Sequence, residues 1–342
     1  DRFIRVYGVS ERGSFGEPGS GAAGANILNR TIDDTSAPGA AEVKLRAARE
    51  ERVRPFRDDK VLADWNGLAI AALARAGAAF HEPALTDAAA RAADFILARM
   101  RGRDGRLLHR WRDGEADIAA FADDHAFLAW GLLELYAAGF DTRHLEAAIA
   151  LADELLALFW DDAAGGFYQA AADAVDGRTL RRKSFADGVM PSSNSAGLLV
   201  LARLAGITGR QDYRRKAERL VRAYPADAPD LAAALGAFFS APDLMGGPSF
   251  EVVVAGDPAA TDTEVMLLEL RRRFLPHVTV ILRPTDTADP PITRIAPFTA
   301  AQTAIGGRAT AYVCEAGSCR LPTTDVPTML EQLGAGRFPH AR

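Results

Sequence analysis

The segment Arg57–Ala74, RDDKVLADWNGLAIAALA, sets the pattern on which most of the chain is built. A polar stretch leads into a helix without a charged residue from Gly67 to Ala74, and such a helix is expected to be buried on all sides. The same arrangement returns at Phe121–Tyr136, FADDHAFLAWGLLELY, and at Asp187–Leu204, DGVMPSSNSAGLLVLARL. We call these three segments the junctions.

A second type of helix follows each junction, and its apolar residues recur at spacings of three and four. The chain therefore alternates buried and striped helices, expected at Gly67–Phe80, Leu85–Met100, Ala126–Phe140, Asp141–Trp160, Ala196–Thr208 and Gln211–Tyr224, with a fourth buried helix at Leu231–Phe239. Hairpins that alternate inner and outer helices are typical of an α/α toroid. An up-down helical bundle or an open helical solenoid is the alternative.

The two ends of the chain differ from this helical middle. Residues 1–40 are rich in Gly and Ser and are expected to form an extended surface segment, in which only Phe3–Val9 alternates like a strand. Residues 41–247 hold the hairpins, preceded by an exposed helix at Ala41–Arg54. Residues 248–342 are predicted to form a small α/β unit, with strands at Phe250–Ala255, Val278–Leu282 and Ala309–Cys314 and helices at Thr263–Phe274 and Asp325–Leu333, the last capped by Asp325. The predicted fold class is mainly α, an α/α toroid with this small unit.

The long loops of the predicted toroid gather at one end. Turns from inner to outer helices are short, whereas the connections Arg101–Ala120 and Asp161–Met190, which lead back to inner helices, are long. They lie at the end that carries the N-termini of the inner helices and their unpaired N–H groups, which we call the mouth. Hairpin-like pieces of these loops, such as GRLLHRWRDG, bring Trp111 to the mouth.

Composition and charge exclude several classes of protein. With 342 residues, 49% hydrophobic and 25% charged, the chain has the composition of a globular protein with a sizeable core. A net charge of −5 with scattered basic residues argues against a nucleic-acid or membrane partner. No uncharged apolar run approaches the ~20 residues of a membrane span, and no signal core is present at the start.

Two cysteines, Cys314 and Cys319, are too few for a disulfide framework and fit a cytoplasmic protein. The sequence between them, EAGS, predicts a turn across which the two face each other, as thiols or as a reversible disulfide. Their spacing is not the C-x-x-C of a redox site, and it is a weak signal for zinc.

Asp64, Asp124 and Asp187 each stand at or just before the start of a buried helix, where a carboxylate caps free N–H groups. Capping alone accounts for each of them singly. Together they bring acids to one mouth, which is the pattern of general acid/base catalysis on a sugar. We therefore predict these three as catalytic residues. Their neighbours are predicted to bind the substrate: Trp65, Asn66, Trp111, His125, Ser193 and Asn194.

Other chemistries find less support at the junctions. Asp123, Asp124 and His125 make a poor metal site, because adjacent helical residues point in different directions. The PSSNSAG stretch does not resemble the G-x-S-x-G turn of a serine nucleophile. We predict neither a metal nor a cofactor.

Four motifs, RDDKVLADWNGLAIAAL, FADDHAFL, DGVMPSSNSAGLLVLARLA and AYVCEAGSCRLPTTD, resemble in this order the YyaL family of thioredoxin-domain-containing proteins, which includes spermatogenesis-associated protein twenty. The resemblance implies a helical part similar to six-hairpin glycosidases and N-acylglucosamine 2-epimerases, and an upstream thioredoxin-like domain as partner. The chain lacks an initiator Met, so we expect it to be N-terminally truncated and the toroid to be incomplete. The sequence departs from the family in two places: YGVSERGSFGEPGSG carries extra Gly and Ser, and only His125 stands at the mouth, whereas sugar epimerases use a histidine pair.

The sequence thus predicts a carbohydrate-active enzyme of the glycosidase or epimerase type, with a small carbohydrate as its ligand. The alternative is a non-catalytic toroid that serves as a binding or scaffold module for the thioredoxin-like redox domain.

Overall fold

The computed structural model describes residues 2–15, 24–30, 39–174, 181–224, 235–239, 241, 247, 249–315 and 317–334. By internal contacts the chain divides into two compact units, Asp1–Asp58 and Asp59–Arg342, and each is described by itself. The predicted segment boundaries, 1–40, 41–247 and 248–342, stay predictions.

The described part of the first unit contains two helices, α1 (Arg2–Tyr7) and α2 (Ala40–Glu50). The helix predicted at Ala41–Arg54 is confirmed by α2. The strand predicted at Phe3–Val9 is wrong, because these residues form α1. A helix places residues four apart on one face, so Phe3 and Tyr7 meet there with their ring centroids 4.7 Å apart. Much of the segment 1–40 lies outside the described residues.

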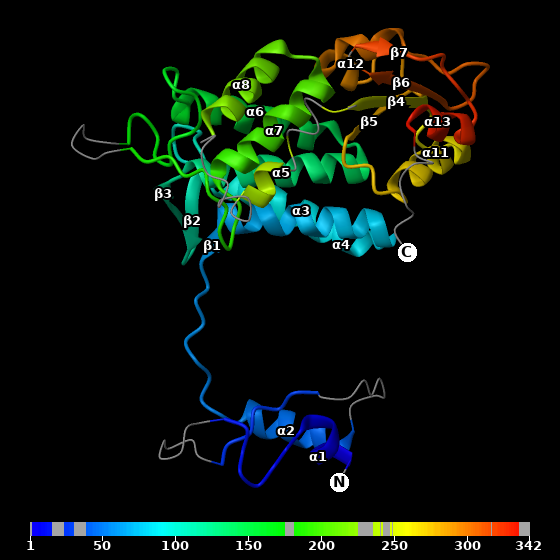
Figure 1. Cartoon of the computed structure of the whole chain (residues 1–342). Coiled ribbons are helices and arrows are strands. Elements are labelled where there is room, and N and C mark those ends of the chain that lie inside the picture. The colour runs from blue at the N-terminus through cyan, green and yellow to red at the C-terminus, as the bar shows by residue number, and fades with distance from the viewer. Residues whose placement is uncertain are drawn as a thin grey trace. The chain divides into compact units, whose positions relative to one another are not determined.

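In its described residues, the second unit is built on three helical hairpins: α3 (Ala63–Phe80) with α4 (Pro83–Arg99), α5 (Ala122–Gly139) with α6 (Thr142–Phe159), and α7 (Ser193–Thr208) with α8 (Gln211–Ala223). The inner helices form one row, in which α3 packs on α5, α5 on α7, and α7 on the short α9 (Gly236–Phe239). Each outer helix packs on the inner helix before it (Figure 1). This layering confirms the predicted fold class. The predicted helix Leu231–Phe239 is described only in its last part.

Burial of the inner helices follows their place in the row. Helices α5 and α7 have an inner neighbour on both sides and are buried around most of their circumference, as predicted. Helix α3 is buried on one side only, and Trp65 and Phe80 are exposed. The prediction that α3 is buried on all sides is therefore wrong, because among the described residues it has an inner neighbour only in α5.

A small antiparallel sheet, in the order β1-β2-β3, lies at the start of the row. Its strands are β1 (Val61–Leu62), β2 (Leu108–Arg112) and β3 (Glu115–Ala119). The predicted hairpin in GRLLHRWRDG is confirmed by β2 and β3. Because β1 continues directly into α3, this sheet is fixed at the N-terminus of that helix, and Val61 pairs with Trp111.

The C-terminal part is the predicted α/β unit, with a sheet in the order β5-β4-β6-β7. Strand β4 runs parallel to β5 and antiparallel to β6. One face of the sheet, with Val253 and Ile281, joins the helical core, and the other, with Val252 and Val254, packs on α11 and α13. The elements are β4 (Phe250–Gly256), α11 (Thr261–Arg271), β5 (Val278–Pro284), α12 (Ile292–Ile295), the 3₁₀-helix η2 (Pro297–Ala301), β6 (Thr310–Glu315), β7 (Ser318–Cys319) and α13 (Val326–Gln332).

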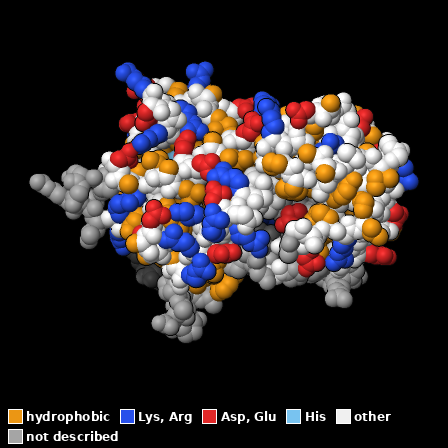
Figure 2. Space-filling view, turned by 90° about the horizontal axis from the view of Figure 1, so that it is seen from above, with side chains coloured by type: hydrophobic (Ala, Val, Ile, Leu, Met, Phe, Trp, Pro, Cys, Tyr) orange, Lys and Arg blue, Asp and Glu red, His pale blue; other side chains and the backbone are white. Residues whose placement is uncertain are grey.

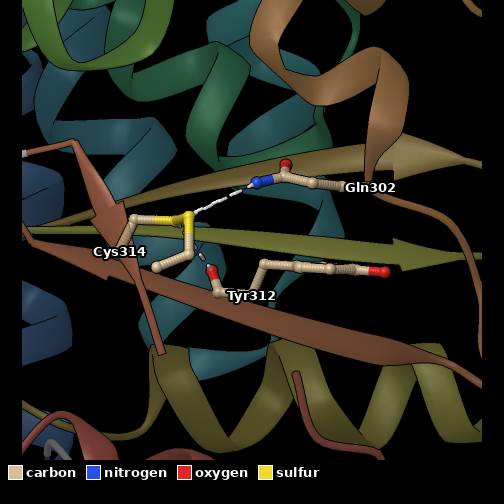
Figure 3. The surroundings of a disulfide bond; sticks show 4 residues. Gln302, Tyr312 and Cys314 are labelled. Carbon is tan, nitrogen blue, oxygen red and sulfur yellow. Dashed lines mark hydrogen bonds between the residues drawn. A yellow bond between two sulfur atoms is a disulfide. The ribbon is translucent and has the colours of Figure 1, made fainter. Parts of the chain in front are cut away.

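Two local predictions for this unit are confirmed. Asp325 caps α13, since its Oδ2 accepts the N–H of Thr328 at 2.9 Å. Cys314 and Cys319 face each other across the turn between β6 and β7 and form a disulfide. The Nε2 atom of Gln302 lies 3.9 Å from each of the two sulfur atoms; Figure 3 shows its contact with Cys314.

The surface carries charges of both signs. On the face shown in Figure 2, acidic and basic side chains are interspersed. Within the described ranges, no helix combines the length and the apolar character needed to cross a membrane.

Candidate active site at the N-termini of the inner helices

Asp124 joins the first turns of two inner helices. It is the third residue of α5 and is completely buried. Its Oδ2 accepts the N–H of Phe121, the N-cap of its own helix, at 2.7 Å. Its Oδ1 accepts the N–H of Asp64 in α3 at 3.0 Å. The N-cap of α3 is Leu62, which has no side-chain acceptor, so Asp124 supplies the cap of α3 from the neighbouring helix.

His109 on β2 completes this arrangement. Its Nδ1 lies 2.9 and 3.1 Å from the two carboxylate oxygens of Asp124. The hydrogen bond with Asp124 raises the pKa of His109, although partial burial opposes the rise. The side chain keeps 20% of its exposure, and Nε2 makes no hydrogen bond to any described residue. An imidazole that is oriented by a buried carboxylate, with its other nitrogen free, is suited to proton transfer.

Asp64 lies against this pair. The residue is 7% exposed, and its Oδ1 accepts the N–H of Trp65 at 2.7 Å. Burial, followed by the charge of Asp124, raises the pKa of Asp64. A carboxyl with a raised pKa holds its proton at higher pH, as a general acid must.

Asp64, His109 and Asp124 also form the group of described residues that could hold a metal ion, with one ligand atom from each within 4.8 Å of the others. Both oxygens of Asp124, however, already accept hydrogen bonds from backbone N–H groups and lie within hydrogen-bond distance of His109. The hydrogen bonds account for the arrangement of all three side chains without an ion.

Asp123 connects the second junction to the third. The hydroxyl and the N–H of Ser193, at the start of α7, and the side chain of Gln169 lie beside its carboxylate and lower its pKa. Burial raises the pKa of Asp123 more than these groups lower it, so the net shift is upward. Asp123 was not among the predicted catalytic residues. A helical spacing in the sequence could have identified Asp123. Trp130 follows it by seven residues and Glu134 follows Trp130 by four, which places the three on one face of α5.

Asp187 lies at a separate place in the row. Its Oδ1 accepts the N–H of Ser192, the N-cap of α7, and its Oδ2 accepts the N–H of Ala237 in α9, both at 2.8 Å. The carboxylate therefore ties α7 to α9. Because backbone groups occupy both oxygens, the contacts of Asp187 give no support to its predicted catalytic role.

Asn194 is likewise engaged with the backbone. It is completely buried, and its Oδ1 accepts the N–H of Phe167 at 2.6 Å. Its Nδ2 donates to the carbonyl oxygens of Phe167 at 3.0 Å and Ser184 at 2.8 Å. These bonds hold the long loop before α7 against that helix and leave the Asn194 side chain no free group for a ligand.

His125 lies in the interface of α5 and α6. Its Nδ1 is 3.0 Å from the carbonyl oxygen of Phe121, and its Nε2 is 3.3 Å from Glu154. Burial raises the pKa of Glu154, but His125 and Arg101 outweigh it, so the net shift is downward. The expectation of a single histidine at the mouth needs correction, because His109, which the sequence reasoning missed, also lies there.

The remaining predicted substrate-binding residues differ in how far their side chains are open to a ligand. Trp65 is 59% exposed, which leaves most of its ring open to a ligand. The Nδ2 of Asn66 donates to the carbonyl oxygen of Leu62 at 2.8 Å within the first turn of α3. Trp111 packs edge-on against Phe95 of α4, with centroids 5.5 Å apart, as part of the core.

Comparison with known proteins finds relatives by sequence. Human and rat spermatogenesis-associated protein 20 are each 31% identical to this chain over 356 aligned residues, which cover 96% of the chain and 45% of the relative. An uncharacterized protein of Caenorhabditis elegans is 29% identical over 74% of the chain and 35% of its own length. The chain thus spans less than half the length of these relatives. No family model matches the sequence.

Solved structures show partial similarity. The cellobiose 2-epimerase of Spirochaeta thermophila superposes with a TM-score of 0.41 and 19% identity, covering 49% of this chain and 43% of the enzyme. A GH76 α-mannanase of Bacteroides thetaiotaomicron gives a TM-score of 0.41 at 17% identity, over 50% of this chain and 46% of the enzyme.

Proposed function

We propose that this chain, a homologue of spermatogenesis-associated protein 20, is the helical part of an acid–base enzyme that acts on a carbohydrate. The observation that carries the proposal is the pair formed by His109 and the buried Asp124, with Asp64 beside it. Neither the family relationship nor the fold identifies a reaction, so the proposal rests on the chemistry of these three side chains.

His109 is the proton-transfer group in this proposal. Asp124 fixes the ring through Nδ1, so Nε2 is the nitrogen that takes a proton from the substrate or returns one. Asp64, whose pKa is raised by burial, acts as the acid. Asp123, with a pKa raised by the same cause, is the second candidate for that role. Hydrolysis and epimerisation of a sugar both need two groups with different pKa values, one that gives a proton and one that takes it.

The geometry narrows the possible hydrolytic chemistry. An inverting glycosidase separates its two carboxyl groups by about 6.5–9.5 Å to leave room for a water molecule. The nearest carboxylate oxygens of Asp64 and Asp124 lie within 4.8 Å. This pair therefore has no room for inverting chemistry, and Asp124, completely buried, is a positioning residue for His109.

Trp65 provides a surface for the sugar. It follows Asp64 directly, and its ring is mostly exposed, whereas Trp111 is packed on Phe95. Aromatic rings combine a large apolar face with little conformational freedom to lose, and so stack well against the apolar face of a pyranose.

The test is to incubate the protein with a panel of reducing disaccharides and α-mannan oligosaccharides and to follow the sugars by ¹H NMR, which detects epimers and hydrolysis products alike. Turnover is expected for one class and should fall at least a hundredfold in His109→Gln, the size of a typical general acid–base contribution. His81→Asn is the matched control, because His81 is exposed and the left-handed backbone at this position suits Asn. Equal turnover in both variants would refute the role of His109.

The alternative function is a non-catalytic module for a thioredoxin-like domain in the longer protein. The observation in its favour is that Asp124, Asp187 and Asn194 all make side-chain hydrogen bonds to backbone groups, which is a structural role. In that case no sugar is turned over or raises the melting temperature, in the native chain or in His109→Gln.

A further inference from the structure

The described part of the second unit contains a cavity of about 520 Å³ between the inner helices and the α/β unit, within the size range of small-molecule sites. Its lining includes Arg75 of α3, Glu134 of α5 and Arg203 of α7 from the helical side, and residues of α11 and β5 from the other. Figure 1 shows α11 and β5 beside the C-terminal ends of α3 and α5, away from β1–β3.

The charged groups of this cavity lie far from His109 and Asp124. Glu134 follows Asp124 by ten residues on α5, and Arg75 follows Asp64 by eleven on α3. At about 1.5 Å of rise per helical residue, the two sets are roughly 15 Å apart along the helices. The proposed active site does not use these residues.

The lining is strongly cationic, although the chain as a whole has a net charge of −5. It contains four arginines, Arg75, Arg203, Arg271 and Arg273, and one acid, Glu134. Arg203 Nη1 is 2.6 Å from Glu134 Oε1, and Arg273 pairs with Glu269, outside the lining, at 2.6 Å. Arg75 Nη1 lies 3.9 Å from the same oxygen of Glu134. Three of the four arginines therefore have a carboxylate partner, and Arg203 and Arg75 share one.

Arg271 is the one arginine of the lining that has no carboxylate partner among the described residues. Its Nη2 donates to the carbonyl oxygen of Ala138 at 2.8 Å, and its guanidinium lies 5.3 Å from the centroid of the Phe140 ring. No described acid lies within salt-bridge distance of it, and its buried Nε has no hydrogen-bond partner among the described residues. Burial lowers the pKa of Arg271, the expected effect of desolvating a charge without a counterion. A partly buried guanidinium of this kind is a binding group for a carboxylate or phosphate.

Most of the remaining wall is apolar, although Ser195 and Thr279 also line it. Phe274 stands exposed there. The leucine, isoleucine and valine side chains that α7, α11 and β5 contribute are Leu199, Ile207, Leu267, Leu270, Val278 and Val280. A polar sugar would leave this surface without a partner, whereas a ligand with an apolar body would remove it from water.

We propose that this cavity binds an amphipathic anion, with its carboxylate or phosphate head at Arg271 and Arg75 and its apolar body against α7, α11 and β5. The two head groups share one recognition chemistry, because the oxygens of both accept charge-assisted hydrogen bonds from guanidinium N–H groups. The site is independent of the carbohydrate site proposed above.

The test is isothermal titration calorimetry of the full chain with decanoate, decyl phosphate, decyl glucoside and inorganic sulfate, the three amphiphiles each below their aggregation concentration. One molecule of decanoate or decyl phosphate should bind per chain, and the tighter of the two identifies the head group. Decyl glucoside has the same apolar body without the charge, and sulfate has the charge without the body; both should bind at least tenfold more weakly. Equal binding of either one would overturn the proposal.

Two variants assign the site. Arg271→Gln should weaken binding of the preferred anion at least tenfold, whereas Arg272→Gln, the neighbouring arginine outside the lining, should leave it unchanged. Should Arg271→Gln fail to fold, Arg75→Gln takes its place, because Arg75 is 62% exposed and its loss leaves the core intact. Unchanged affinity in a folded variant of Arg271 would refute the assignment. His109→Gln should bind the anion like the native chain, so failure of the carbohydrate proposal would leave this one standing.

Discussion

Gly67 of α3 and Gly131 of α5 lie directly against each other. A Cβ atom on Gly131 would stand 2.5 Å from the carbonyl oxygen of Gly67, and one on Gly67 would stand 2.5 Å from the backbone N of Leu128. The two inner helices thus touch backbone to backbone, in the first half of α3 and around the middle of α5. This close approach lets the N–H of Asp64 reach the carboxylate of Asp124.

Replacing either glycine by alanine should push the helices apart. Because the obstructing atoms are backbone, side-chain rotation cannot relieve the overlap, and we expect Gly67→Ala and Gly131→Ala each to cost about 3 kcal/mol of unfolding free energy. Urea denaturation measures this cost. Gly139→Ala, on the same helix α5, is the control, since a Cβ there meets no atom within 4 Å. It should be neutral or stabilise by about 0.4–1 kcal/mol, and equal losses in all three variants would contradict the contact.

The pair of His109 and Asp124 should make stability depend on pH. The pKa of His109 is raised above its ordinary value of 6.5, so protonation favours the folded state. The contribution is fully present below pH of about 6.5 and is lost as the pH rises through the raised pKa. The difference in melting temperature between the native chain and His109→Gln should therefore be largest near pH 6 and shrink toward pH 9. His81→Asn should show no such trend, since His81 makes no hydrogen bond to a described carboxylate, and a constant difference for His109→Gln would count against the pair.

The Asp64 carboxyl, proposed above as the catalytic acid, should lower the stability of the folded chain at neutral pH. Its raised pKa means that the folded chain favours the protonated carboxyl, a contribution present at low pH and lost as the pH rises through the folded pKa. Asp64→Asn keeps the acceptor for the Trp65 N–H and removes the buried charge, so it should melt at a higher temperature than the native chain at pH 7 and at the same temperature below pH of about 3.8. The exposed Asp87 offers the matched change, Asp87→Asn, with little effect expected at either pH. A variant at Asp64 that is less stable at pH 7 would contradict this account.

The disulfide between Cys314 and Cys319 should add a modest, measurable stability. The loop that it closes is short, with a sequence separation of 5, and the loop-entropy model gives about 2 kcal/mol for a loop of this size. Dithiothreitol should accordingly lower the melting temperature by a few degrees. The double variant Cys314→Ala, Cys319→Ala should melt at the lower temperature with or without the reductant. If dithiothreitol acts equally on both proteins, the disulfide is not the cause.

A structural feature could be predicted from the sequence when its signal came from the residues of a single element. The uncharged windows of α5 and α7 and the striped pattern of α6 and α8 depend on single helices, and they placed the hairpins correctly. The strand expected at Phe3–Val9 was wrong, because a short alternating run is ambiguous until a partner strand is known. The exposed face of α3 could not be foreseen, since it reflects which neighbours the helix has.

Only part of the candidate site could be predicted, because its contacts join residues that are far apart in the sequence. Helix starts mark Asp64 and Asp124 in the sequence, but their contact crosses sixty residues of chain. His109 meets Asp124 from a β-hairpin, and only the alternation of β2, which puts His109 and Trp111 on one face, hints at its direction. Asp187 and Asn194 looked equally functional because a cap and a catalytic acid occupy the same position at a helix start, and only their hydrogen-bond partners separate the two roles.

The carboxylates at the mouth link each inner helix to the next: Asp124 joins α3 to α5, Asp123 joins α5 to α7, and Asp187 joins α7 to α9. An isolated helix frays at its first turn at almost no cost, whereas here fraying of one first turn breaks a bond to its neighbour. The N-terminal turns of the row are thereby coupled into one cooperative opening unit. The backbone amides of Asp64, Ser192 and Ala237, far apart in the sequence, would then exchange their hydrogens with solvent through a single shared event.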